Sequence, residues 1–277
     1  MLSHSSGSKP ACAIVTRPAR EAAQWVARLQ ARGIAACALP LIAITPVRMP
    51  ALLQALQQAR ARFADYRAVM FVSGNAAQHF FESNQPLKLI QQAQTAINMR
   101  AWAPGPGTVA ALRQAGLAAT RIDAPGIDAA QYDSEALWQV VAPQIGPGDR
   151  VLIVRGTNTP GAEGGNGRDW LAAQITAAGA AVDFVAAYER TAPDLDSDEL
   201  TLARAAAGDG SIWLLSSSEA IGHLTTALPG QDWSRARALV THPRIAQAAH
   251  AAGFAQVTQC RPAFNEVAAS IESLHEH

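Results

Sequence analysis

The chain has 277 residues, of which 49% are hydrophobic and 16% charged, so it has enough apolar side chains to fill a sizeable core. Lys plus Arg and Asp plus Glu are equal at 22 each, which argues against a broad basic surface for nucleic acid or membrane. Only Lys9 and Lys88 are lysines, so the other 20 basic residues (22 − 2) are arginines. Guanidinium groups of this kind bind carboxylates through paired hydrogen bonds.

The cysteines and the amino-terminal residues indicate a cytoplasmic protein. Cys12, Cys37 and Cys260 show no CxxC spacing, which argues against a zinc site or a disulfide framework. Residues 1–15 have no long apolar core, so they are not a signal peptide, and we expect a frayed tail before the first strand. No run reaches the ~18 apolar residues of a membrane helix. We expect a soluble monomer, because no exposed apolar stripe stands out.

The chain then follows a strand–helix–strand pattern. Residues 11–18 form a short apolar run stopped by Pro18, which is typical of a buried strand. Residues 19–33 place apolar side chains on one helical face and end at Gly33, a common stop position. Residues 34–47 are apolar and extended, with two prolines, and complete a β-α-β unit.

The same order recurs later in the chain. Residues 150–193 again read as strand, helix and strand, with a glycine stop at Gly179 and a closing Pro193. A strand, a proline-containing turn and an alanine-rich helix also occur twice, at residues 100–116 and 236–253. Strands that alternate with helices at this spacing predict parallel sheets with helices on both faces.

We interpret the pattern as a tandem duplication of one α/β unit, with halves of roughly 11–127 and 149–277. The predicted fold is two similar doubly wound parallel-sheet domains. In open α/β sheets ligands bind at the carboxyl ends of the strands. Two such edges facing one another would form a cleft.

Two polar junctions of similar sequence each lie between a buried strand and a helix. They are Ser73-Gly74-Asn75 and Ser216-Ser217-Ser218. Their serines either cap the following helix or help its first-turn amides to bind an anion, and the sequence leaves both readings open. A G-x-S-x-G elbow is absent, which argues against a hydrolase nucleophile.

A second pair of strand-to-helix junctions differs between the halves. Gly105, Gly107 and Thr108 suit a turn with exposed amides, whereas the counterpart carries His242 and Arg244. Arginine at a helix start opposes the helix dipole, so Arg244 either points away or holds an anion. His242 is the one histidine that we place in a site.

Three other features have a structural and a functional reading. The glycine-rich residues 161–167 lack G-x-G-x-x-G and a Gly-Lys-Ser/Thr, so we expect a flexible insertion near the cleft mouth and not a nucleotide site. His79 and His223 lie about six residues into equivalent helices, which favours packing over metal binding. Tyr188 is either a half-buried interface residue or a phenol that hydrogen-bonds a leaving oxygen.

A set of short stretches in fixed order carries a family resemblance. They are "IVTRP", "ALPLIAITPV", "VMFVSGNAAQHF", "APGPGTVAALRQAG", "VLIVRG", "VAAYERTAP", "WLLSSSEAIGHL" and "VTHPRIAQAAHAAGF". Each stretch alone is weakly specific, but in this order they resemble the uroporphyrinogen-III synthase family. The likeness runs over essentially the whole chain, from about Ala11 to Leu274.

The resemblance implies two α/β domains joined by a two-stranded linker. One domain would combine residues 1–38 with 194–277, and the other would comprise residues 48–187. Residues 39–47 and 188–193 would be the linker strands.

The resemblance also implies the activity. The family is a lyase of tetrapyrrole and heme biosynthesis that cyclises linear hydroxymethylbilane, with inversion of the last pyrrole ring, to uroporphyrinogen III and water. It acts without cofactor or metal. Hydroxymethylbilane is therefore the expected partner, with a possible transient contact to hydroxymethylbilane synthase. We expect neither a nucleic acid nor a membrane partner.

By resemblance, Ser73, Thr108 and Tyr188 line the family's cleft, with Ser216 as the repeat's equivalent. Tyr188 would assist departure of the hydroxyl oxygen. The arginines expected to hold the substrate's acetate and propionate groups are Arg17, Arg155, Arg190 and Arg244.

The chain departs from the family at "THPRIA". Many relatives have a threonine pair where this chain has Pro243 and Arg244, so that hydroxyl contact does not carry over. The competing interpretation is a non-catalytic two-domain cleft protein that binds a small anionic ligand.

Overall fold

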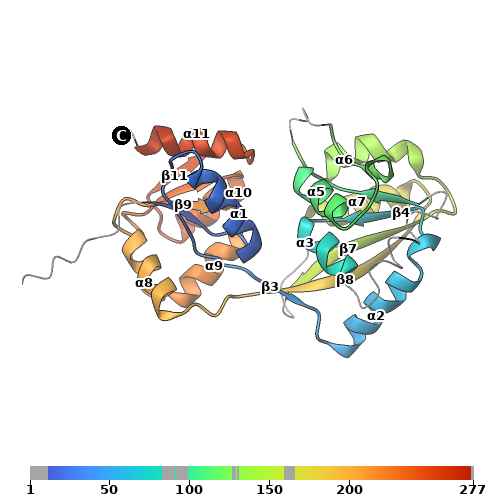
Figure 1. Ribbon diagram of the computed structural model, residues 1–277, viewed down its shortest axis with the longest axis horizontal. Coiled ribbons are helices and arrows are strands. Elements are labelled where there is room, and N and C mark those ends of the chain that lie inside the picture. Colours follow the sequence, from blue (N-terminus) through green and yellow to red (C-terminus); the bar gives the residue numbers. More distant parts are fainter. Residues whose placement is uncertain are drawn as a thin grey trace, which may run out of the picture. The chain divides into compact units, whose positions relative to one another are not determined.

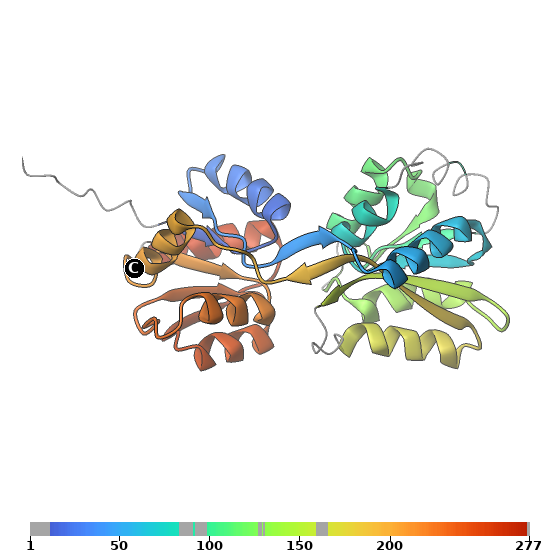
Figure 2. The ribbon, with the colours of Figure 1, turned by 90° about the horizontal axis from the view of Figure 1, so that it is seen from below.

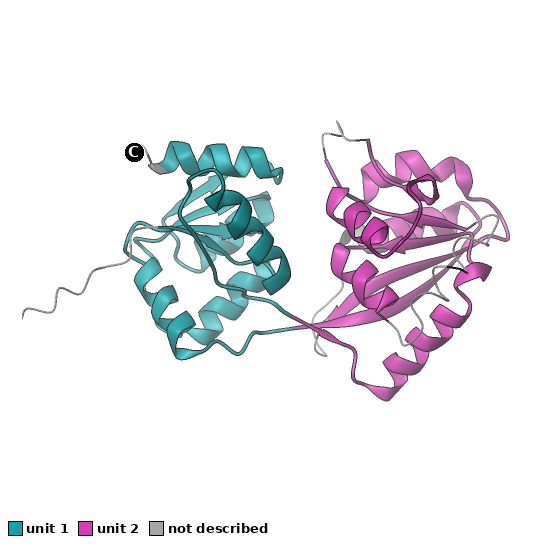
Figure 3. Ribbon diagram, viewed as in Figure 1, with its two compact units in different colours: residues 1–43, 191–277 teal, residues 44–190 magenta. Residues whose placement is uncertain are grey.

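The computed structural model describes residues 12–82, 91, 99–126, 129, 131–158 and 166–275. Most of the predicted glycine-rich insertion, residues 161–165, lies outside them. The chain divides into two compact units, which are Met1–Ala43 with Thr191–His277 (unit 1) and Ile44–Arg190 (unit 2) (Figure 3). Among the described residues, no helix is long and apolar enough to cross a membrane.

Unit 1 contains a parallel sheet assembled from both ends of the sequence. Its strands are β1 (Ala13–Val15), β2 (Ala36–Ala38), β9 (Ile212–Leu215), β10 (Arg237–Val240) and β11 (Gln256–Gln259). They lie in the order β11-β10-β9-β1-β2, and each neighbouring pair is parallel (Figure 1). The helices are α1 (Ala19–Gln30), α8 (Ser197–Ala206), α9 (Ser218–Ala227), α10 (Pro243–Ala251) and α11 (Phe264–His275).

Unit 2 contains the second sheet. Its strands are β3 (Ala43–Pro46), β4 (Ala68–Phe71), β5 (Arg100–Trp102), β6 (Ile122–Asp123), β7 (Arg150–Asn158) and β8 (Ala181–Thr191). Their order is β3-β8-β7-β4-β5-β6, with parallel pairing from β8 through β6. The helices are α2 (Pro50–Ala61), α3 (Gly74–Phe81), α5 (Pro106–Gln114), α6 (Ser134–Val141) and α7 (Asn166–Ala177).

The two sheets share one strand order. Each sheet contains two strands joined by one helix (β1 and β2, or β7 and β8) and a run of three further strands (β9 to β11, or β4 to β6). In each sheet the first strand of the pair, β1 or β7, lies beside the first strand of the run, β9 or β4. The β-α-β pair of unit 1 precedes its three-strand run in the chain, whereas that of unit 2 follows it. The predicted extended segment of residues 34–47 contains two strands. It divides into β2, in the unit 1 sheet, and β3, in the unit 2 sheet.

The core explains why helices cover both faces of the unit 2 sheet (Figure 2). In β4, Val69 and Phe71 belong to one apolar cluster with α2, α3 and α5, whereas Ala68 and Met70 belong to another with α6 and α7. Successive side chains of a strand point to opposite faces, so a strand buried on both sides has to be apolar throughout. The predicted α/β class with parallel sheets is confirmed.

One arginine secures the end of the helix that follows β4. The Arg60 guanidinium donates hydrogen bonds to the carbonyls of Phe80 (2.8 Å), His79 (2.6 Å) and Glu82 (3.0 Å) at the carboxyl end of α3. The last carbonyls of a helix have no intrahelical donors, and a cation is favourable at this end of a helix. Burial lowers the pKa of Arg60 from its usual value.

Replacing Arg60 by methionine should destabilise unit 2. Arg60→Met leaves the α3 carbonyls without their charged donor, so the free energy of unfolding should fall by roughly 1–3 kcal/mol. Urea unfolding followed by circular dichroism measures it. The matched control is Arg62→Met, since Arg62 is half exposed and makes a 3.6 Å pair with Asp65. Equal stability of the two variants would contradict this role of Arg60.

Candidate active site at the carboxyl ends of the strands

The parallel pairing of unit 2 brings the ends of its strands to one edge of the sheet. The register of β4 against β7 pairs Phe71 with Val154, and that of β7 against β8 pairs Gly156 with Tyr188. Ser73 lies two residues after the end of β4. Residues that are far apart in the sequence therefore meet at one edge, which is where open α/β sheets bind ligands.

Ser73 and Tyr188 are in direct contact. Ser73 Oγ and the Tyr188 hydroxyl are 3.1 Å apart, across 115 positions of the chain. Ser73 is in an extended conformation and caps α3, where its Oγ accepts a 3.1 Å hydrogen bond from the Ala76 amide. Tyr188 is 2% exposed and part of the apolar core, whereas Ser73 is half-buried. Tyr188 is thus buried more deeply than the half-buried interface tyrosine that the sequence suggested.

The sequence interpretation missed two neighbours of Tyr188. The His79 ring stacks on the Tyr188 ring, with centroids 5.8 Å apart and planes 29° apart. A Cβ atom on Gly156 would lie 2.5 Å from Tyr188 Cε2, so the ring rests against the glycine backbone. Helical spacing identified His79 only as a packing residue, and no local signal marked Gly156.

The starts of α3 and α5 lie against one another through glycines. A Cβ atom on Gly74 would come within 3.4 Å of the Gly107 carbonyl oxygen and 3.6 Å of Ala111 Cβ. Neither helix has an acidic residue in its first turn. Two helix starts side by side concentrate partial positive charge, and the lack of carboxylates there favours an anion.

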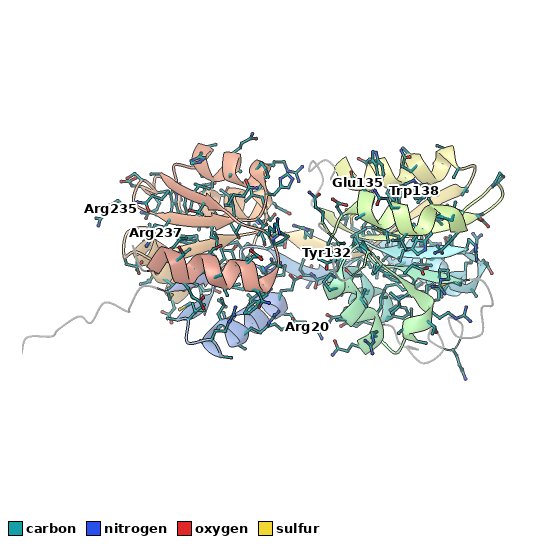
Figure 4. All side chains as sticks on the ribbon, turned by 90° about the horizontal axis from the view of Figure 1, so that it is seen from above. Arg20, Tyr132, Glu135, Trp138, Arg235 and Arg237 are labelled. Carbon is teal, nitrogen blue, oxygen red and sulfur yellow. The ribbon has the colours of Figure 1, made fainter. Side chains whose placement is uncertain are left out.

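Other residues of these two junctions differ in accessibility. Asn75 is half-buried in the first turn of α3, and Gly107 is exposed. Thr108 is 5% exposed, so its hydroxyl is poorly placed for a ligand and the exposed position at this turn is Gly107. Tyr132, labelled in Figure 4, packs at this turn as well, because a Cβ atom on Gly105 would lie 3.2 Å from Tyr132 Cβ. No sequence signal pointed to Tyr132.

The junctions of unit 1 are built differently. His242 caps α10, where its Nδ1 accepts a 3.1 Å hydrogen bond from the Arg244 amide, and both residues are exposed. No side-chain cap forms at Ser217, so the Ser216-Ser217-Ser218 junction does not reproduce the capping geometry of Ser73. Glu219 lies in the first turn of α9, which makes this helix start less favourable for an anion than α3.

Arg17 stands at a small pocket at the end of β1. Its guanidinium lies 4.5 Å from the centroid of the Trp25 ring and 3.4 Å from a Glu21 carboxylate oxygen. The pocket, which Ser216 and Thr241 also line, has a volume of about 10 Å³, enough for one water or one carboxylate oxygen. Burial lowers the pKa of Arg17 from its usual value.

Arg155 lies in unit 2, on β7. Its guanidinium stacks 4.8 Å above the ring of Phe184, an exposed residue of β8. Within the described residues, no group of three or more His, Cys, Asp or Glu side chains is arranged to hold a metal ion.

Comparison with known families decides which family the chain belongs to. A family model described as "Uroporphyrinogen-III synthase HemD" matches residues 23–267, most of the chain. The chain belongs to the uroporphyrinogen-III synthase family. The expected activity, a lyase that cyclises hydroxymethylbilane to uroporphyrinogen III in tetrapyrrole biosynthesis, is thereby confirmed, and the non-catalytic alternative is not favoured.

Solved structures support the fold of this uroporphyrinogen-III synthase family member. The uroporphyrinogen-III synthetase of Helicobacter pylori is 14% identical, with a TM-score of 0.57, and the match covers 96% of this chain and 100% of that chain. A mutant uroporphyrinogen III synthase of Thermus thermophilus is also 14% identical, with a TM-score of 0.54, covering 96% of this chain and 99% of that chain.

The residues that the sequence predicts for substrate binding are divided between the two units. Unit 2 holds Ser73, Gly74, Asn75, Gly107, Thr108, Arg155 and Tyr188. Unit 1 holds Arg17, Ser216, Ser217, Ser218, His242 and Arg244. Ser73 touches Tyr188, and Gly74 lies near Gly107, so the synthase's unit 2 gathers the serine, the tyrosine and two helix starts at one edge.

Asn75→Asp should stabilise the fold and weaken substrate binding. A carboxylate in the first turn of α3 complements the helix dipole by about 0.3–1 kcal/mol, but it repels an anionic substrate. We expect KM to rise roughly fivefold, the factor that about 1 kcal/mol represents. Thermal unfolding and steady-state kinetics measure the two effects.

The matched control is Ala51→Asp, in the first turn of α2, which also lacks an acidic residue. It should give a similar stabilisation with an unchanged KM. An unchanged KM in Asn75→Asp would remove the start of α3 from the anion site.

Proposed function

We propose that this chain forms uroporphyrinogen III by holding hydroxymethylbilane through its carboxylates at the carboxyl edges of the parallel sheets, with the Ser73–Tyr188 hydroxyl pair at the leaving oxygen. The observation that carries the proposal is the 3.1 Å contact between Ser73 Oγ and the Tyr188 hydroxyl. This contact lies at the same edge as the starts of α3 and α5, whose first turns lack acidic residues.

The reaction needs little from the protein besides orientation and a proton donor. The electron pair of a pyrrole nitrogen expels the hydroxyl oxygen of the hydroxymethyl group, which leaves as water once it accepts a proton. The methylene carbon so exposed is attacked by the substituted α-position of the last ring, which gives a spiro intermediate. The bond between that position and the original methylene bridge then breaks, the freed methylene bonds to the ring's unsubstituted α-position, and the proton lost there balances the proton that left with water. The protein holds the linear substrate folded so that the substituted position attacks and the unsubstituted position does not. This is catalysis by orientation and differential binding.

The hydrogen bond from the Ala76 amide to Ser73 Oγ fixes the serine beside Tyr188. Ser73 keeps its own proton and a second lone pair, so either hydroxyl of the pair can be the donor. When Ser73 donates to the Tyr188 oxygen, Tyr188 is able to donate to the leaving oxygen, and successive hydrogen bonds in such a chain strengthen one another. Because Tyr188 is 2% exposed, substrate can meet only a small part of it, and half-buried Ser73 shares the contact.

The helix starts and the arginines supply the binding energy in this proposal. The Gly74, Asn75 and Gly107 positions offer amides to acetate or propionate groups, and Arg155 adds a guanidinium in unit 2. In unit 1, Arg17 is the better placed of the predicted arginines because it lines a pocket. His242, Arg244 and the serines at 216–218 supply further polar groups of unit 1.

The cellular setting is part of the same proposal. A cytoplasmic location fits the cysteine usage, and docking of hydroxymethylbilane synthase would shorten the path of an unstable substrate. Both stay predictions from the sequence.

The isomer composition of the product tests the proposal. Hydroxymethylbilane is generated in place, and the oxidised porphyrin isomers are resolved by chromatography. The wild-type chain should raise isomer III over isomer I. Tyr188→Phe removes the donor and should lower kcat roughly 10²-fold, within the range of general acid catalysis. Ser73→Ala should lower kcat by a smaller factor, because Tyr188 keeps its hydroxyl.

Tyr66→Phe is the matched control for the loss of a phenol. Tyr66 is a buried residue of unit 2 whose hydroxyl donates to Asp183 at 3.0 Å, away from Ser73. It should leave kcat within about twofold. Isomer I alone from folded wild-type protein would overturn the function, and an unchanged kcat in Tyr188→Phe would overturn the role of Tyr188.

A further inference from the structure

We infer that Gly156 and His79 are positioning residues that hold the ring of Tyr188 so that its hydroxyl stays on Ser73. The inference rests on the proposed function and extends it to two residues beyond the Ser73–Tyr188 pair. It is carried by the close approach of the ring to Gly156 and by its stacking on His79.

Gly156 has no side chain, and the Tyr188 ring occupies the space that a side chain at position 156 would fill. A Cβ atom there would lie 2.5 Å from Tyr188 Cε2, 2.6 Å from Cζ and 3.0 Å from the hydroxyl oxygen. Real Cβ atoms do not approach so closely, so any side chain at position 156 displaces the ring. The two residues are register partners in β7 and β8, directly after a register irregularity between Arg155 and Gly156. Such irregularities re-aim a side chain near a site.

His79 borders the same ring from α3. Its imidazole is stacked on Tyr188, its side chain is 12% exposed, and its Nδ1 lies 3.3 Å from Glu82 Oε2. The backbone beneath it is fixed too, because Arg60 donates to the His79 carbonyl. α3 therefore holds the tyrosine at two points, through Ser73 at the hydroxyl and through His79 at the ring.

This arrangement matters for rate because the hydroxyl swings with the ring. Displacing a reacting group by about 1 Å can cost on the order of 10²-fold in rate. Carboxylate binding at the helix starts does not depend on the ring. Substitutions at positions 156 and 79 should therefore lower kcat and leave KM nearly unchanged. If these residues only stabilised the fold, their substitution would lower the free energy of unfolding and leave the kcat of the folded molecules unchanged.

Gly156→Ala should lower kcat about 100-fold with KM within about twofold. His79→Ala should lower kcat roughly tenfold, and His79→Phe, which keeps a stacking ring, should restore it to within about threefold. Gly222→Ala is the control for adding a methyl group, since nothing lies within 4 Å of a Cβ atom there. It should match wild type in kcat.

The decisive step is a double-mutant cycle with Tyr188→Phe. If the two residues act through the Tyr188 hydroxyl, Gly156→Ala and His79→Ala should cost less than about threefold in the Tyr188→Phe background. Full additivity, or a wild-type kcat in both single variants, would overturn the inference.

Failure of the proposed function would look different, since wild type itself would then yield no isomer III. The position of the ring is also read without turnover, from the ¹³C–¹H signals of the Tyr188 ring. These signals should shift in Gly156→Ala and His79→Ala and stay unshifted in Gly222→Ala. Unshifted signals in the two positioning variants would contradict the contacts themselves.

Discussion

The site depends on one constraint, the parallel pairing of β8, β7, β4 and β5. Parallel strands end at a common edge, so groups scattered over the sequence converge there without any local signal joining them. The pairing of Gly156 with Tyr188 extends β7 and β8 beyond the end of β4, and this extension brings the phenol to Ser73. Had the register slipped by one residue, Tyr188 would face the other side of the sheet.

Tyr188 combines a deeply buried ring with a hydroxyl that needs a hydrogen-bond partner. A ring that is 2% exposed is held rigidly by the apolar core, but its hydroxyl requires a partner when it is taken out of water. Ser73 provides that partner and is itself bonded to the α3 backbone. In the proposed mechanism, a donor fixed in this way needs no reorganisation when charge develops on the leaving oxygen, which is the condition for electrostatic preorganisation.

Much of the fold follows from local signals, and the contacts between segments do not. Buried apolar runs and glycine stops predict the strands and helices in order, because each signal lies within its own element. The division of residues 34–47 between two sheets is not local, and only the family resemblance, which separates residues 1–38 from a linker strand at 39–47, indicated it. Ser73 and Tyr188 were each identifiable, but their contact depends on sheet register. Gly156 and His79 have meaning only beside Tyr188, so helix and strand patterns could not reveal them.

Amide chemical-shift mapping with uroporphyrinogen III, the product, tests the central claim most directly. Our account predicts that the perturbed amides concentrate at the carboxyl edge, at Ser73, Gly74 and Gly107. The turns at the opposite ends of the strands, at Gly33 and Gly148, should stay unperturbed. Perturbations centred on those turns, with the amides of α3 and α5 unchanged, would contradict the account.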